Sequence, residues 1–135
     1  AREFEIPWVR RPFDLPMEAG PAPESASRRL LTRALRGVAP RFDRILRDTG
    51  CRTTDHFAGF AFTGHFDATH LVALLERLPP GSTEFMTHPG RCGAELQQAA
   101  TRLKQSREKE LEALCAPEVK QALARHNIRL SDYRS

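Results

Sequence analysis

The chain has 135 residues, of which 40% are hydrophobic and 28% are charged, and its formal net charge is +4. A chain of this length suits one domain, at residues 1–135, and buries about two-thirds of its unfolded surface. No apolar run approaches the roughly 20 residues that span a bilayer, and no secretory signal is visible, so we expect no membrane span. Three widely spaced cysteines without a C-x-x-C motif argue against a disulfide framework or a zinc ribbon and favour a cytoplasmic protein.

The positive charge lies mostly in arginines near the N-terminus and in the segment 28–47. On a helix these arginines spread around the axis, and no aromatic residues alternate with them. A nucleic-acid-binding surface usually has a clustered basic face or a stacking platform. We therefore expect no nucleic-acid partner, although a basic nucleic-acid-binding domain stays among the alternatives.

The first third of the chain predicts a strand, a loop and a helix. Residues 4–10 are rich in β-branched and aromatic side chains, which favours a strand. Residues 12–24 hold four prolines and predict a loop. A helix follows and ends at Gly50, and Pro40 is expected to kink or split it. Its apolar face is formed by Leu31, Leu35, Val38, Phe42 and Ile45.

The middle of the chain predicts two further strands with a helix between them. Residues 54–58 and 82–86 are the strands. Asp67 is the expected N-cap of the helix. Four leucines at i, i+3, i+4 and i+7 spacing form a stripe that predicts a buried face: Leu71, Leu74, Leu75 and Leu78.

The last third predicts two helices and a closing strand. One helix covers 93–115 and is expected to break near Ser106, a second begins at Pro117, and residues 128–133 form the strand. The order β-α-β-α-β-α-α-β predicts an α/β fold with about four mostly parallel strands and flanking helices. This arrangement suits a partial TIM-like (β/α) barrel. Its uncovered edges and apolar face call for a small open sheet or for a partner, such as a second copy bound through the open barrel face.

The tetrapeptide Thr87-His88-Pro89-Gly90 follows the third predicted strand. In (β/α) barrels, catalytic side chains gather where strands end, so His88 is a candidate acid or base. The alternative is a histidine that only satisfies nearby backbone groups. No H-x-x-x-H pair is present to place two ligands on one helical face, so we expect no metal site built within this chain alone.

Several segments in order resemble the YdjC-like carbohydrate deacetylases, a family that includes chitooligosaccharide deacetylases and hopanoid-biosynthesis-associated homologues. The matching runs are TDHFAGF with TG at 54–64, LLERLPPGSTEFMTHPG at 74–90, SREKEL at 106–111 and a C-terminal stretch that contains IRL at 128–130. The resemblance covers nearly the whole chain. Each run alone is weak, but their order and spacing together are fairly specific.

The resemblance implies a TIM-barrel-like, metal-dependent hydrolase that removes acetyl groups from N-acetylated amino sugars or oligosaccharides. A divalent metal, Mg or Zn, would polarise the acetyl carbonyl and activate water, and a histidine would protonate the departing amine. The family's Asp-Asp motif and metal-binding histidines have no counterpart here. The chain thus resembles the C-terminal half of such an enzyme, and by itself is expected to bind no metal and to be inactive.

The resemblance also suggests site residues. His88 is the expected general acid or substrate contact. Arg10 could orient a catalytic carboxylate from the absent half, or be a surface arginine. Asp55 and His56 could line the sugar cleft, or cap a turn. Core packing is favoured over stacking on sugars for Trp8, Phe57, Phe60 and Phe62. The alternative function is a non-catalytic interaction or oligomerisation module.

Overall fold

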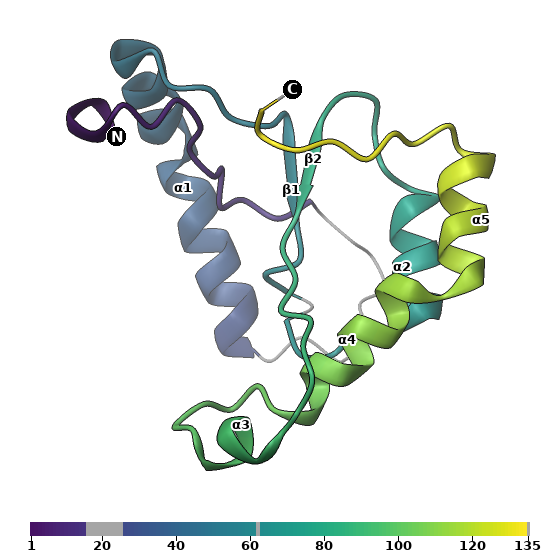
Figure 1. Cartoon of the computed structure of the whole chain (residues 1–135). Coiled ribbons are helices and arrows are strands. Elements are labelled where there is room, and N and C mark those ends of the chain that lie inside the picture. The colour runs from purple at the N-terminus through teal and green to yellow at the C-terminus, as the bar shows by residue number, and fades with distance from the viewer. Residues whose placement is uncertain (16–25, 62, 135) are drawn as a thin grey trace. The chain divides into compact units, whose positions relative to one another are not determined.

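A computed structural model of the chain describes residues 1–15, 26–61 and 63–134 (Figure 1). Their contacts gather into two units, which are described separately. The strand unit holds the described residues of Ala1–Ala19, Pro23–Ala61 and Pro80–Met86. The helical unit holds the described residues of Phe62–Pro79 and Thr87–Ser135. In the described residues the fold is mixed α/β, with mostly helices and two short parallel strands.

The strand unit is built on the parallel pair β1 (His56–Ala58) and β2 (Thr83–Phe85), which lie side by side in Figure 1. Phe57 pairs with Glu84, and the Met86 N–H donates to the Ala58 carbonyl at 2.8 Å beyond the last pair. Phe57 is 1% exposed and Ala58 is equally buried, as an apolar strand in a covered sheet requires. The strands predicted at 54–58 and 82–86 are therefore confirmed in shortened form.

The segment from Trp8 to Asp14 forms two parallel bridges to the chain at Arg52 and at β1, without forming a continuous strand. Trp8 bridges Arg52, and Asp14 bridges Phe57. The strand predicted at 4–10 is wrong, because η1 (Arg2–Phe4) is a 3-10 turn and Glu5 has a φ of 51°. Residues 12–15 of the predicted loop lie alongside β1, where the Leu15 N–H donates to the Phe57 carbonyl. The remainder of that loop lies outside the described residues.

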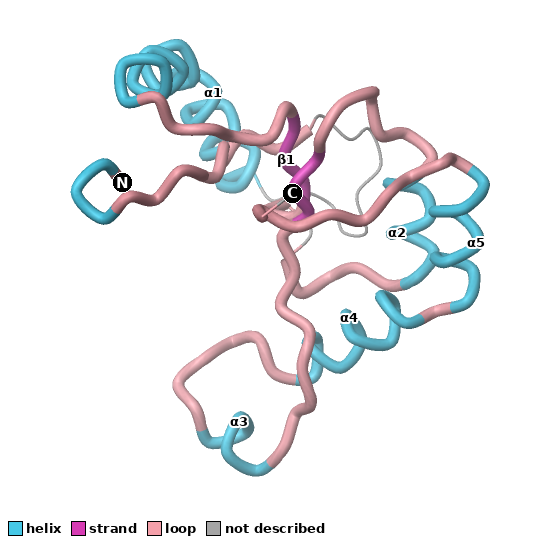
Figure 2. The backbone as a smooth tube through the Cα atoms, turned by 45° about the horizontal axis from the view of Figure 1, so that its top comes forward, coloured by secondary structure: helices cyan, strands magenta, loops and turns pink. Residues whose placement is uncertain are grey.

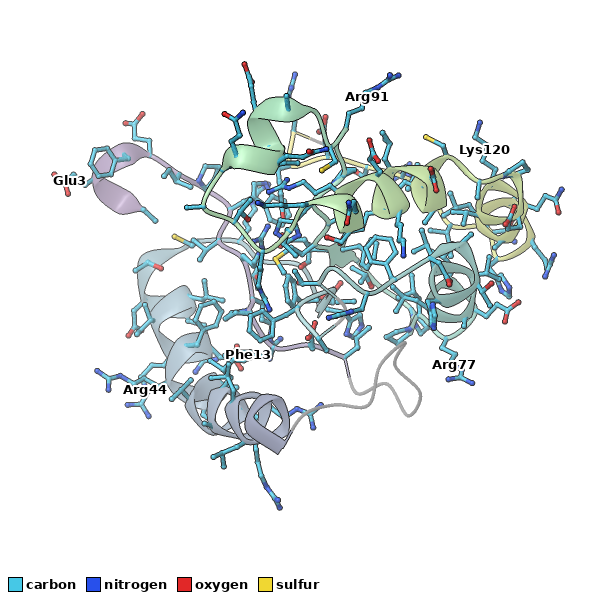
Figure 3. All side chains as sticks on the ribbon, turned by 90° about the horizontal axis from the view of Figure 1, so that it is seen from below. Glu3, Phe13, Arg44, Arg77, Arg91 and Lys120 are labelled. Atoms are coloured by element: carbon cyan, nitrogen blue, oxygen red, sulfur yellow. The ribbon has the colours of Figure 1, made fainter. Side chains whose placement is uncertain are left out.

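Helix α1 (Ala26–Thr49) is one helix that contains Pro40, so the proline does not split it. Gly50 ends it with a φ of 68°, as predicted. Phe13 contacts Phe42 edge to face at a centroid distance of 5.4 Å, and an Arg11–Asp43 ion pair of 3.3 Å lies beside this contact. Figure 3 shows Phe13 beside α1, whereas Arg44 extends away from the helix.

Helix α1 also carries a row of exposed apolar side chains, which we call the outer stripe. Its spacing of seven residues from Leu31 to Val38 to Ile45 keeps these side chains on one side of the helix. The stripe consists of Leu30, Leu31, Val38 and Ile45, which are 46–71% exposed. Among the described helices, α1 included, none is long and apolar enough to cross a membrane.

The helical unit is held together by α2 (Ala68–Leu75), α4 (Gln105–Cys115) and α5 (Pro117–Arg125), which pack on one another (Figure 2). The Asp67 carboxylate caps α2 by accepting the His70 N–H at 3.0 Å, which confirms the predicted N-cap. Leu75 and Leu78 are half-buried rather than fully buried. The buried apolar side chains are Phe66, Leu71, Leu74, Ala113, Val119 and Ala122.

Two C-terminal predictions differ from the structure. The helix expected at 93–115 is two helices, α3 (Ala94–Gln98) and α4, and the break covers residues 99–104 rather than Ser106. Because α3 buries no residue, packing does not hold a longer helix in place. Residues 128–133 form no strand, since Leu130 is 77% exposed and Tyr133 is 49% exposed.

The close approach of Gly59 to β2 generates a stability prediction. Gly59 has a φ of 117°, and a Cβ there would lie 2.3 Å from the Met86 carbonyl oxygen. We expect Gly59→Ala to lower the free energy of unfolding by more than about 2 kcal/mol, through backbone strain and overpacking. Chemical denaturation measures this change.

The matched control is Gly37→Ala in α1, where a Cβ would meet nothing within 4 Å. That substitution should raise stability by about 0.5–1 kcal/mol, because alanine favours the helix. Equal effects of the two substitutions would contradict the close contact at Gly59.

Candidate functional site

In the strand unit, Arg10 and Glu84 form an ion pair on one face of the parallel strands. The Arg10 Nε donates to Glu84 Oε1 at 2.5 Å, and Nη1 lies 3.5 Å from the Met86 sulfur. The guanidinium carbon lies 5.7 Å from the centre of the Phe57 ring. Since side chains alternate along a strand, Glu84 and Met86 share this face with Phe57. Arg10 thus has a carboxylate partner within this chain, and its catalytic role stays a prediction.

The burial of this pair is uneven. The Glu84 side chain is 10% exposed, whereas that of Arg10 is 51% exposed. The guanidinium lies over an apolar base of Phe57 and Met86 and restricts the carboxylate to one orientation. A carboxylate held in this way could accept a hydrogen bond from a ligand through its remaining lone pairs.

In the helical unit, His88 is fixed through its backbone. It follows β2 by three residues, and its N–H donates to Glu110 Oε2 at 2.6 Å. Its Nδ1 is buried and has no hydrogen-bond partner among the residues that the structure describes. Because imidazole has two nitrogens that exchange donor and acceptor roles, such a side chain is suited to proton transfer.

Glu110 is the buried carboxylate of the helical unit. It is 1% exposed, and its Oε1 accepts the Gly64 N–H at 2.9 Å while Oε2 accepts that of His88. The Ser106 hydroxyl, one turn earlier on α4, is also buried and without a hydrogen-bond partner in the described part of the chain. Glu110 therefore ties the segment after β1 to the segment after β2.

Asp55 and His56 lie at the amino end of β1, beside the turn that precedes β2. The Asp55 Oδ2 accepts the Ser82 N–H at 2.8 Å and the Ser82 hydroxyl at 2.7 Å. The His56 Nε2 lies 3.2 Å from the Pro80 carbonyl oxygen. These contacts brace the turn, while a role in sugar binding stays a prediction for both residues.

A second buried carboxylate, Asp14, holds the segment after β1 in the strand unit. It is 8% exposed and accepts the N–H groups of Phe60 at 3.1 Å and of Ala61 at 2.6 Å. Asp14 lies between the apolar residues Phe13 and Leu15 in a proline-rich stretch. This pattern could have indicated a carboxylate held beside a buried segment. Sequence reasoning named neither Asp14 nor Glu110 as a site residue.

The predicted site residues thus fall into three places. Arg10 contacts Glu84 on β2, Asp55 and His56 contact the turn before β2, and His88 belongs to the helical unit. Of the predicted aromatic residues, Phe57 is core, Trp8 is half-buried, Phe60 is exposed and Phe62 is outside the described residues.

The metal that the resemblance implies does not fit the residues described here. No group of three or more histidine, cysteine, aspartate or glutamate side chains in residues 1–15, 26–61 and 63–134 is placed to hold a metal ion. Structural and catalytic zinc sites normally draw at least three ligands from the protein. No step of the chemistry is therefore routed through a metal on this chain.

The family of the chain is shown by comparison with known protein families. The model of the family described as "YdjC-like protein" matches residues 1–125, and the chain belongs to this family. No curated protein matches the sequence significantly.

A solved structure from Enterococcus faecalis V583 is similar in fold. That protein is named as a candidate cellobiose-phosphate cleavage protein. The two structures superimpose with a TM-score of 0.57 at 23% sequence identity, over 82% of this chain and 40% of the other. The likeness shows the fold, and this chain spans less than half of the length of that protein.

The Asp55–Ser82 contact predicts a pH dependence of stability. Hydrogen bonds from the backbone and side chain of Ser82 hold the pKa of Asp55 below its usual value of 3.8. A carboxylate with a lowered pKa in the folded state stabilises the fold above pH 3.8, and this stabilisation is lost as the pH falls through the folded-state pKa.

We expect Asp55→Asn to be less stable than the wild type at neutral pH, and the difference to shrink as the pH falls below 3.8. Urea unfolding of both proteins across this range measures the difference. A difference that stays constant with pH would mean that the carboxylate charge does not act through Ser82.

Proposed function

We propose that this chain is the C-terminal part of a carbohydrate N-deacetylase, and that His88 supplies the proton to the departing amine. The observation that carries the proposal is the position of His88, directly after a parallel strand in a chain of the YdjC-like family. The carboxyl ends of parallel strands are where ligands bind in α/β folds.

The fold part of the proposal is that the three parallel segments belong to a TIM-like barrel. Residues 7–15, β1 and β2 run side by side in one direction, as neighbouring barrel strands do. The remaining strands would come from the rest of the parent protein. The span of 40% in the E. faecalis structure supports this division.

In the proposed reaction, water adds to the acetyl carbonyl of an N-acetylated amino sugar, the C–N bond breaks, and the amine nitrogen takes a proton from the His88 imidazole. This chain contributes the proton transfer. The groups that activate water, together with the divalent metal expected in the parent, are assigned to residues outside this chain.

Arg10 and Glu84 are proposed to take part through substrate orientation. Glu84 is almost covered and is fixed by Arg10, so its free lone pairs point in a defined direction. Sugar hydroxyls are donors that suit such an acceptor. In this reading Arg10 is a positioning residue and Glu84 is the contact.

The test is His88→Ala in the full-length parent, assayed by acetate release from N-acetylated chitooligosaccharides. Loss of a general acid typically costs 10²–10⁴-fold in rate, and we expect kcat to fall by about that factor. The control is His126→Ala, since His126 is exposed at the end of α5. Unchanged acetate release by the His88 variant would refute the role of His88.

The outer stripe of α1 favours a second candidate, a self-association module. Four apolar side chains that are 46–71% exposed lie on one side of a single helix. Exposed apolar side chains that gather on one side of an element mark interaction sites in soluble proteins. A second copy of the chain, which would present the same stripe, is the proposed occupant.

We expect the mass of the wild-type chain in light scattering to rise above the monomer value of 15.2 kDa with concentration. Leu31→Glu should keep the mass at the monomer value, because it places a charge in the stripe. The matched control is Leu130→Glu, which changes an exposed leucine outside α1 and should associate like the wild type. A wild type that is monomeric at every concentration would exclude this candidate.

A further inference from the structure

Helix α4 accepts a series of backbone N–H groups from the segment that carries His88. The N–H of His88 donates to the Glu110 carboxylate at 2.6 Å, and that of Gly90 to the Arg107 carbonyl oxygen at 3.1 Å. The N–H of Cys92 donates to the Glu108 carboxylate at 2.9 Å. Every second N–H of this segment is thus bound to one helix, as in an extended chain whose successive N–H groups point to opposite sides.

The burial of the same segment alternates in step with these hydrogen bonds. The residues at 88, 90 and 92 are half-buried, whereas Pro89 and Arg91 are exposed, and Figure 3 shows the Arg91 side chain extending away from the ribbon. The proline also removes helical conformations from the residue before it. The backbone at His88 is therefore restricted by its neighbour and bound by α4.

Among these three acceptors, Glu110 differs in two respects. It is 1% exposed, whereas Glu108 is exposed, so the Glu110 carboxylate is shielded from water. It also binds a second segment through the Gly64 N–H. Burying a carboxylate is unfavourable unless hydrogen bonds compensate, so its two N–H donors are held in defined positions.

We infer that Glu110 is the positioning residue of His88: it fixes the backbone from which the imidazole projects and couples it to the segment at Gly64. This inference rests on the proposed role of His88 as proton donor. Glu110 does not touch the reacting atoms. Its effect on the reaction passes through the position of the His88 ring, where a displacement of about 1 Å can cost 10²-fold in rate.

The first test uses the full-length parent and compares Glu110→Gln, His88→Ala and the double variant. Glu110→Gln keeps the shape of the side chain but replaces one acceptor oxygen with a donor. We expect kcat to fall about 10–100-fold with little change in KM. In the His88→Ala background, Glu110→Gln should cause no further loss, because residues that act through one another are not additive.

Two controls separate positioning from general stability. Val119→Ala creates a cavity in the same helical unit without touching His88, and Glu112→Gln changes an exposed glutamate on α4. Neither should lower the kcat of folded protein. Losses from Glu110→Gln and His88→Ala that multiply in the double variant would overturn the inference, as would an equal loss of kcat in Val119→Ala.

The second test does not depend on deacetylase activity. In NMR spectra of this chain, Glu110→Gln should move the amide signals of Gly64 and His88 and the ring signals of His88, whereas Val119→Ala should leave the ring signals in place. If Glu110→Gln does not fold, hydrogen exchange of the wild type decides, since both amides should be protected. Unmoved ring signals in a folded variant, or rapid exchange of both wild-type amides, would overturn the inference. A parent that lacks deacetylase activity would refute the proposed function, and these signals would still decide the role of Glu110.

Discussion

The helical unit depends on one buried carboxylate, that of Glu110, whose burial from water must be compensated by hydrogen bonds. Glu110 is 1% exposed, and in the described residues it forms no ion pair but accepts two backbone N–H groups. An uncompensated buried charge would destabilise a unit of this size, so the two donors cannot move far from the carboxylate. The segments at Gly64 and at His88 are consequently held by the same side chain. The backbone at His88 is therefore held in a defined position.

The strand unit applies the same device with a different residue. Asp14 accepts the N–H groups of Phe60 and Ala61, just after β1 ends. In both units, a short segment outside the sheet has backbone N–H groups that donate to a carboxylate instead of to a neighbouring strand. Such segments are irregular in backbone but fixed in place, which is what a binding site at strand ends requires.

Some elements could be predicted from local sequence, whereas others depend on contacts with distant residues and could not. The Asp67 cap, the Gly50 helix end and the two strands follow from side-chain hydrogen bonding, positive φ and β-branched or aromatic content. The strand predicted at 128–133 fails because strand propensity counts only when a neighbour supplies hydrogen bonds. Residues 4–10 do have such a neighbour at Trp8, but the positive φ of Glu5 interrupts the extended backbone before it. A 3-10 turn and exposed side chains replace the two predicted strands.

The candidate site was predictable to a similar extent. His88 could be singled out because a histidine before Pro-Gly at the end of a predicted strand can be recognised from the sequence alone. Glu84 as the partner of Arg10 requires knowing that residues 74 positions apart meet on one face. Glu110 is harder still, because a glutamate on a charged helix is normally exposed and no local pattern marks it as buried.

Trp8 has a practical consequence that follows from its position. It is the only tryptophan of the chain, it bridges Arg52, and the Arg52 guanidinium lies 5.9 Å from its ring centre. Its fluorescence emission therefore reports on the strand unit and not on the helical one. Far-UV circular dichroism responds to helices in both units, so agreement or disagreement between the two signals during melting tells whether the units lose their structure in one cooperative event.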